Sequence, residues 1–198
     1  MNESKEYQKS IDNIDSDKLG QMTIRSSIRS LEQHPAKKVI TTISELLNNM
    51  CKENSSLEIN DKNVASNKKI KFFMLKKVPS ISIKDFLFRL TKYSKICEST
   101  LVMILIYIDR MCHKYNFKIT YYNIYKLMLA AMVVAIKYNE DEFYTLDFYG
   151  KLGGISKLEM NILEYEFACM INFKLYITEE LFYKYYELLL NSSSTEKE

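Results

Sequence analysis

The chain has 198 residues, enough for one domain with a sizeable hydrophobic core and some polar tail. Its 4 Gly, 2 Pro and no Trp, against 15 Tyr, 10 Phe and 10 Met, leave few turn residues and disfavour a β-sheet protein. The 28 basic and 25 acidic residues give a net charge of +3, and this mixed balance indicates neither a nucleic acid nor a membrane surface as the partner.

The N-terminal 1–35 segment is polar and has no apolar stretch of the kind found in a signal peptide. It cannot bury enough apolar surface to offset the entropy of ordering, so we expect a mostly disordered leader. The longest apolar run, 127–136, is shorter than the ~20 residues that a bilayer span needs. The cysteines have no CxxC spacing and are expected to be free thiols: Cys51, Cys97, Cys112 and Cys169. We therefore expect a cytoplasmic or nuclear protein with no membrane association.

The first predicted helix covers 36–54, because apolar residues recur there at helical spacing. The residues expected to form its docking stripe are Val39, Ile43, Leu46, Leu47 and Met50. Residues 55–78 follow as a predicted loop that is polar over most of its length. A loop of this length is unusual in a compact domain and is typically functional or mobile.

Two helices are predicted next. In ISIKDFLFRLTKYSK, after Pro79, Ser82 is the expected N-cap and Asp85 occupies the capping-box position. Its inner face should carry Phe86, Leu87 and Leu90. The second helix, ESTLVMILIYIDRMCHKY, covers 98–115 and has one apolar stripe consisting of Leu101, Leu105, Ile108 and Cys112.

The third predicted helix runs from a cap at Thr120 to about Asn139, and it is apolar nearly all round. Such a helix must be buried on most faces. A short fourth helix, LDFYGKLGG, should close at Gly153 and Gly154, since glycine favours helix C-termini. Ser156 is expected to cap a fifth helix, with Glu159 three residues later. A last helix is predicted at 179–190, and because no segment alternates with period two, we predict an all-α chain.

Residues typical of catalysis are scarce. His34 lies in the leader and His113 near a helix end, with no nucleophile or carboxylate at a recognisable spacing. No Gly-rich phosphate loop is present. The acidic run at 139–142, NEDE, lacks the glycine and ligand spacing of a calcium loop, so we interpret it as a solvated helix end. We expect neither an enzyme nor a cofactor or metal site.

Several segments resemble parts of a cyclin box. YIDRM (107–111) resembles its second helix, AAMVVAIKYNED (130–141) the end of its third, and LEYEFACMINFKL (163–175) its fifth. With PSISIKDFLFRLTKYSK (79–95) and YGKLGGISKLEMNILE (149–164), the match is closest to P/U-type cyclins, the phosphate-signalling class with a single box. The resemblance covers residues 37–190.

The resemblance implies an all-α fold: a five-helix cyclin box at 79–175, a flanking helix on each side at 36–54 and 176–191, and a tail at 192–198. It implies a regulatory cyclin subunit that binds and activates a cyclin-dependent serine/threonine kinase. Cyclins do so by holding the kinase C-helix in the active position, which completes the Lys–Glu–phosphate arrangement. No MRAIL-like recruitment segment precedes Pro79 and no second box follows Leu175.

The resemblance also implies a kinase-binding set. Cyclins use a lysine of helix three and a glutamate of helix five to hydrogen-bond the kinase backbone, and these match Lys137 and Glu164. The matching apolar contact positions are Val134, Tyr138, Phe173 and Leu175. The pair that marks the box, Asp109 and Arg110, is expected to stabilise the fold. The plainer interpretation is that Lys137 and Glu164 are ordinary surface charges and that Phe173 belongs to the core.

Three other functions stay open at this point. The same fold serves as a nucleic-acid-binding module in transcription factors, which would need clustered phosphate contacts from a basic face. Basic and acidic residues nearly balance in the helices after residue 80, so we expect no nucleic acid as partner. A small enzyme would need a nucleophile and base, and a non-kinase protein scaffold would need neither.

Overall fold

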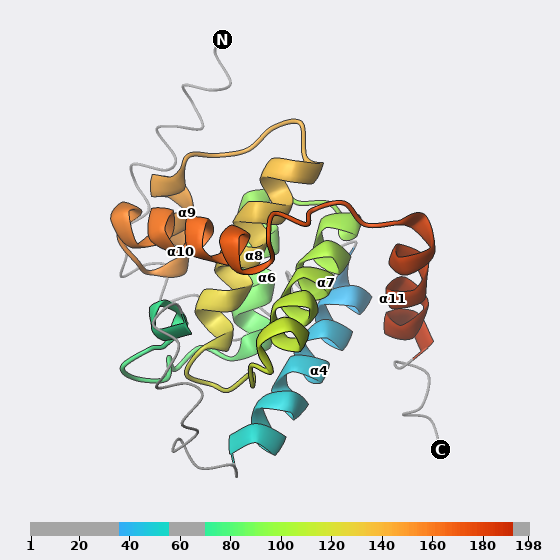
Figure 1. Cartoon of the computed structure of the whole chain (residues 1–198), viewed down its shortest axis with the longest axis horizontal. Helices are drawn as coiled ribbons and strands as arrows, with labels where there is room; N and C mark the ends of the chain where they lie inside the picture. Colours follow the sequence, from blue (N-terminus) through green and yellow to red (C-terminus); the bar gives the residue numbers. More distant parts are fainter. Residues whose placement is uncertain (1–35, 56–69, 192–198) are drawn as a thin grey trace. The chain divides into compact units, whose positions relative to one another are not determined.

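The computed structural model describes residues 36–55 and 70–191, and within them the chain forms seven α-helices, one 3-10 helix and no β-strand (Figure 1). The prediction of an all-α fold is therefore confirmed. The elements are α4 (Lys37–Ser55), η1 (Ile70–Phe73), α6 (Ile83–Ser94), α7 (Glu98–Tyr115), α8 (Ile124–Asn139), α9 (Leu146–Gly153), α10 (Lys157–Met170) and α11 (Glu179–Asn191). The five consecutive helices α6 to α10 correspond to the predicted box, and α4 and α11 flank them.

Three predicted segments lie outside the described residues: the leader at 1–35, residues 56–69 of the loop and the tail at 192–198. The described end of that loop is not irregular, because it contains η1. The Phe73 ring of η1 meets the Phe167 ring of α10 edge-on, with 6.2 Å between the centroids. The Lys126 ammonium donates to the carbonyls of Phe72 and Met74, so η1 is tied to both α8 and α10.

Helix α8 is the centre of the core, as its composition predicts. Every residue from Ile124 to Ile136 is buried except Lys126. The neighbours that cover α8 are α6, α7, α9, α10 and η1, and Figure 1 shows α8 between α7 on one side and α9 and α10 on the other. Gly153 of α9 permits one close approach, because a Cβ there would lie 2.2 Å from a methyl carbon of Leu129.

Helix α4 packs against α6, α7 and α11, but its buried stripe differs from the predicted one. The buried apolar side chains are Val39, Ile40, Ile43, Leu47 and Cys51. The prediction was wrong for Leu46, which is 43% exposed, and Met50 is only half-buried. The stripe advances by three and four residues from Ile40 to Cys51, and Leu46 lies about 100° away from Leu47 around the helix.

The N-caps agree with the sequence at two of three places, and Gly154 ends α9 as predicted. The Ser82 hydroxyl accepts from the Asp85 amide at 3.0 Å, and the Ser156 hydroxyl accepts from the Glu159 amide at 3.1 Å. Thr120 is not the cap of α8, and that prediction was wrong. Helix α8 begins at Ile124, while the Asn123 carboxamide oxygen accepts from the Thr120 amide at 2.9 Å and closes a turn before the helix.

Candidate functional site

The C-terminal turn of α8 carries a charged and an aromatic side chain to the surface. Lys137 and Tyr138 are the first residues of α8 after its long buried stretch to be exposed, and Tyr138 is 47% exposed. The predicted contact residue Val134 lies one turn earlier and is buried. Val134 therefore lies beneath this surface rather than on it.

Lys137 of α8 pairs with Glu164 of α10. The Lys137 Nζ atom lies 2.5 Å from a Glu164 carboxylate oxygen, and the two side chains are 34% and 17% exposed. The structure thus brings together the two charged residues that the cyclin resemblance selects, although they lie 27 positions apart in the sequence. An ammonium has three donors and a carboxylate has several acceptor sites, so each group can bind further partners while it stays in the pair.

A tight turn after α10 presents Phe173 at the surface. Asn172 and Phe173 both have left-handed backbone angles, with φ of 57° and 52°. The Phe173 amide donates to the Ala168 carbonyl at 2.8 Å, one helical turn after Glu164. The Phe173 side chain is 60% exposed, so the interpretation of Phe173 as a core residue is wrong. A bulky residue at positive φ is uncommon and marks a position held by its surroundings.

The segment that follows this turn is held by hydrogen-bond donors from α7. Arg110 donates to the carbonyls of Lys174, at 2.5 Å, and Tyr176, at 3.0 Å. The Tyr107 hydroxyl donates to the Leu175 carbonyl at 2.7 Å. Burial raises the pKa of Tyr107, so this hydroxyl stays protonated and continues to donate. Leu175 is half-buried, and Arg110 joins α7 to the segment after α10.

Two further hydrogen bonds join α7 to later parts of the chain, one to the end of α10 and one to α11. The Lys114 ammonium donates to the Met170 carbonyl at 2.7 Å. Asp109 accepts a hydrogen bond of 2.7 Å from the Tyr185 hydroxyl of α11, and burial together with this bond raises the pKa of Tyr185 to about 12. The stabilising role of Asp109 and Arg110 stays a prediction, but α7 directs both side chains at later segments of the chain.

Glu140 is a site residue that sequence reasoning missed. Its carboxylate lies at the N-terminus of α7, where it accepts from the Cys97 amide at 3.0 Å and from the Thr100 hydroxyl at 2.5 Å. Burial alone would raise the pKa of Glu140, but the hydrogen bonds from Thr100 and Cys97 lower it below the usual value for glutamate. An ionised carboxylate at a helix N-terminus is stabilised by the free amides and the helix dipole. This contact fixes the end of α8 that carries Lys137 and Tyr138.

We call the surface formed by Lys137, Tyr138, Glu164, Phe173 and Leu175 the α8–α10 face. It combines one ion pair with two exposed aromatic rings, which is a composition suited to binding another protein. Within residues 36–55 and 70–191, no group of three His, Cys, Asp or Glu side chains is placed to bind a metal ion. None of the helices in the described part of the chain is both long and apolar enough to cross a membrane.

Comparison with known proteins identifies the class. A family model described as Cyclin matches residues 37–175. The "PHO85 cyclin-like protein psl1" of Schizosaccharomyces pombe is 39% identical over 121 residues, which cover 60% of this chain and 50% of that protein. Cyclin-U4-1 of Arabidopsis thaliana is 30% identical over 153 residues, or 77% of this chain and 74% of that protein. Cyclin-P3-1 of Oryza sativa subsp. japonica is 30% identical over 164 residues, or 83% and 67%.

The chain therefore belongs to the cyclin family, and its relatives place it with the P/U-type cyclins. This confirms the resemblance stated from the sequence. The chain spans from half to about three quarters of the length of these three relatives.

Proposed function

We propose that this cyclin binds a cyclin-dependent serine/threonine kinase through the α8–α10 face and activates it by holding the kinase C-helix in the active position. The observation that carries the proposal is the Lys137–Glu164 pair, together with the exposed rings of Tyr138 and Phe173. In this role the cyclin performs no reaction itself. It supplies the kinase with contacts that complete the Lys–Glu–phosphate arrangement of the kinase active site.

The chemistry of the α8–α10 face fits a helix and its adjoining backbone. The Lys137 ammonium can donate to a main-chain carbonyl of the partner, and the Glu164 carboxylate can accept from a main-chain amide. Aromatic side chains are frequent anchors at the centre of protein interfaces. Phe173 fits this role because its backbone is fixed in the turn while most of its ring is exposed.

Replacing either charged residue by alanine tests the proposal. We expect Lys137→Ala and Glu164→Ala each to weaken kinase binding roughly ten- to a hundredfold, because a hydrogen bond to a charged group contributes about 1.5–3 kcal/mol. The double variant should lose less than the sum, since the two side chains also contact each other. The kinase is first captured from an extract of the native cells and identified by mass spectrometry. Its recombinant form is then titrated against each variant and assayed for activity.

The matched control is Lys151→Ala. It removes one partner of the Lys151–Asp147 ion pair of α9, whose Nζ–O distance is 2.9 Å, outside the α8–α10 face. This control should leave kinase affinity and activation unchanged. The proposal fails if Lys137→Ala and Glu164→Ala both retain the wild-type affinity and melting temperature.

A second variant separates binding from folding. Phe173→Gly should keep the free energy of unfolding within about 1 kcal/mol of the wild-type value, because relief of left-handed strain of ~1–2 kcal/mol offsets the flexibility cost of glycine. Kinase affinity should still fall, since the exposed ring is lost. Thermal unfolding and kinase titration measure the two effects. Unchanged affinity would remove Phe173 from the binding site.

A further inference from the structure

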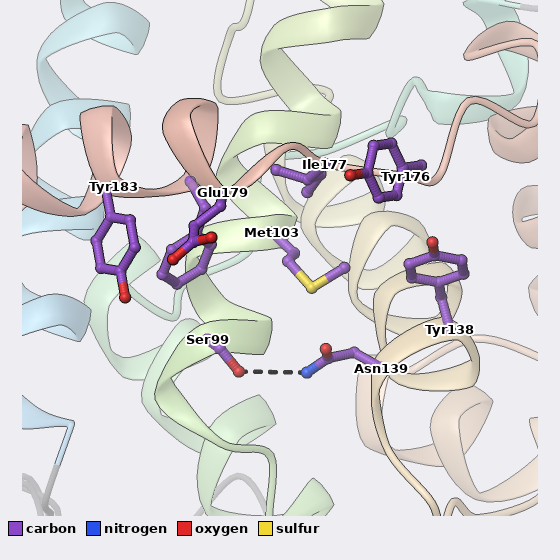
Figure 2. Close-up of a pocket in the computed structure, with 9 residues that line it drawn as sticks. Ser99, Met103, Tyr138, Asn139, Tyr176, Ile177, Glu179 and Tyr183 are labelled. Atoms are coloured by element: carbon purple, nitrogen blue, oxygen red, sulfur yellow. Dashed lines mark hydrogen bonds between the residues drawn. The ribbon is translucent and has the colours of Figure 1, made fainter.

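A groove of about 410 Å³ lies between α11 and the adjoining ends of α7 and α8. Figure 2 shows Tyr138 and Tyr176 on one side and Glu179 and Tyr183 on the other, with Met103 of α7 between them. The volume is at the lower end of the range for ligand pockets, roughly 300–1,000 Å³. It suits one or two side chains better than a folded segment.

The groove has the chemistry of a site for a positively charged side chain. Among the nine described residues that line it, Glu179 is the only charged one, and no lysine or arginine is present. Glu179 is the first residue of α11. Aromatic faces attract cations, and an aromatic lining with a carboxylate provides both the flat surface and the counter-charge that a guanidinium or ammonium group needs.

The walls of the groove are held in place by hydrogen bonds between the surrounding helices. The Asn139 side-chain amide donates to the Ser99 hydroxyl at 3.2 Å, as Figure 2 shows, and joins α8 to α7. The Arg110 guanidinium holds the Tyr176 carbonyl, and the Tyr185 hydroxyl ties α11 to Asp109. A groove whose walls are already ordered loses less entropy when a ligand enters it.

The groove is continuous with the α8–α10 face. Tyr138 belongs to both surfaces, and Tyr176 directly follows Leu175 in the chain. A protein seated on Lys137, Glu164 and Phe173 would therefore also cover the mouth of the groove. We propose that the groove binds an arginine or lysine side chain of the bound kinase. This inference rests on the proposed function and names the chemistry by which the kinase is selected.

Reversal of the charge in the groove provides the test. Glu179→Lys should weaken binding of the recombinant kinase about tenfold or more, because a like charge replaces the counter-charge. The loss of affinity should be smaller at about 0.5 M salt than at about 0.05 M. The reason is that the Debye length falls below about 10 Å at the higher concentration, so the charges are screened. The matched control is Glu180→Lys, since Glu180 is exposed and adjacent in sequence but does not line the groove. It should stay within about twofold of the wild type.

A second measurement does not depend on the kinase. Titration of ¹³C-methyl-labelled protein with N-acetyl-arginine amide should shift the Met103 methyl signal, and the neutral isostere N-acetyl-citrulline amide should not. Glu179→Gln should abolish the shift, and Glu180→Gln should keep it. Equal shifts from both probes, or none from either, would overturn the assignment of the groove to a cation.

The kinase titrations keep the two proposals distinguishable. If Lys137→Ala weakens kinase binding while Glu179→Lys and Glu180→Lys have the same affinity as the wild type, the groove inference is overturned and the proposed function stands. If Lys137→Ala, Glu164→Ala and Glu179→Lys all leave the affinity unchanged, both are overturned.

Discussion

Ala131→Asp should unfold the domain. Ala131 lies in the middle of α8 and is fully buried, with buried residues before and after it. A carboxylate at this position has no solvated side and no cation beside it in the sequence of α8 from Leu127 to Ile136. An unpaired buried charge costs several kcal/mol, which is comparable to the whole stability of a typical domain, about 5–15 kcal/mol.

Circular dichroism and thermal unfolding measure this effect. The variant should lose its cooperative transition or melt far below the wild type. The matched control, Asn161→Asp, introduces the same group at an exposed position of α10 and should fold normally. A native spectrum and melting temperature for Ala131→Asp would mean that α8 is not the centre of the core.

Deletion of residues 1–55 should have the second large effect, because it removes α4. Five buried side chains of this helix pack onto the rest of the domain: Val39, Ile40, Ile43, Leu47 and Cys51. Full burial of a large aliphatic side chain contributes about 1.5–3 kcal/mol. The deletion also removes Asn48, which accepts from the Tyr121 hydroxyl at 2.8 Å, and Asn54, which donates to the Ile119 carbonyl at 2.8 Å. The shortened chain should be insoluble or melt at a much lower temperature.

The control for this deletion is a shorter deletion that removes only residues 1–35. Residues 1–35 have no apolar periodicity in their sequence, so the melting temperature of this chain should stay close to the wild-type value. Solubility and differential scanning fluorimetry of both chains check the prediction. If the longer deletion melts at the wild-type temperature, α4 contributes nothing to the domain.

Helix positions were predictable because they depend on local sequence patterns. The helix predicted at 98–115 is α7 with the same bounds, and the third helix ends at Asn139 as predicted. The Ser82 and Ser156 caps were predictable for the same reason, since a cap bonds to an amide three residues away. The prediction failed at Thr120, although threonine is a common cap residue, because the Asn123 side chain closes a local turn with Thr120 and Lys118 and the helix starts only after it.

The candidate site was only partly predictable, because it is assembled from distant parts of the chain. The family motifs selected Lys137 and Glu164, but no local pattern shows that Phe173 adopts a left-handed conformation without glycine. No sequence pattern indicated that Lys114 bonds to the end of α10. Glu140 was interpreted as part of a solvated helix end, although its carboxylate accepts from the first amide of α7's N-terminal turn. The groove beside α11 depends on how three helices meet, which hydrophobic periodicity does not encode.

The segment after α10 is held by its main chain, and this has a consequence for how such proteins diverge. Tyr107, Arg110 and Lys114 bond to carbonyl oxygens, which every amino acid possesses. A substitution at residue 173, 174 or 176 therefore leaves these bonds intact and changes only an exposed side chain. The main chain of this segment is fixed while its side chains can vary. In the proposed function, the choice of kinase can therefore change by single substitutions that leave the fold as it is.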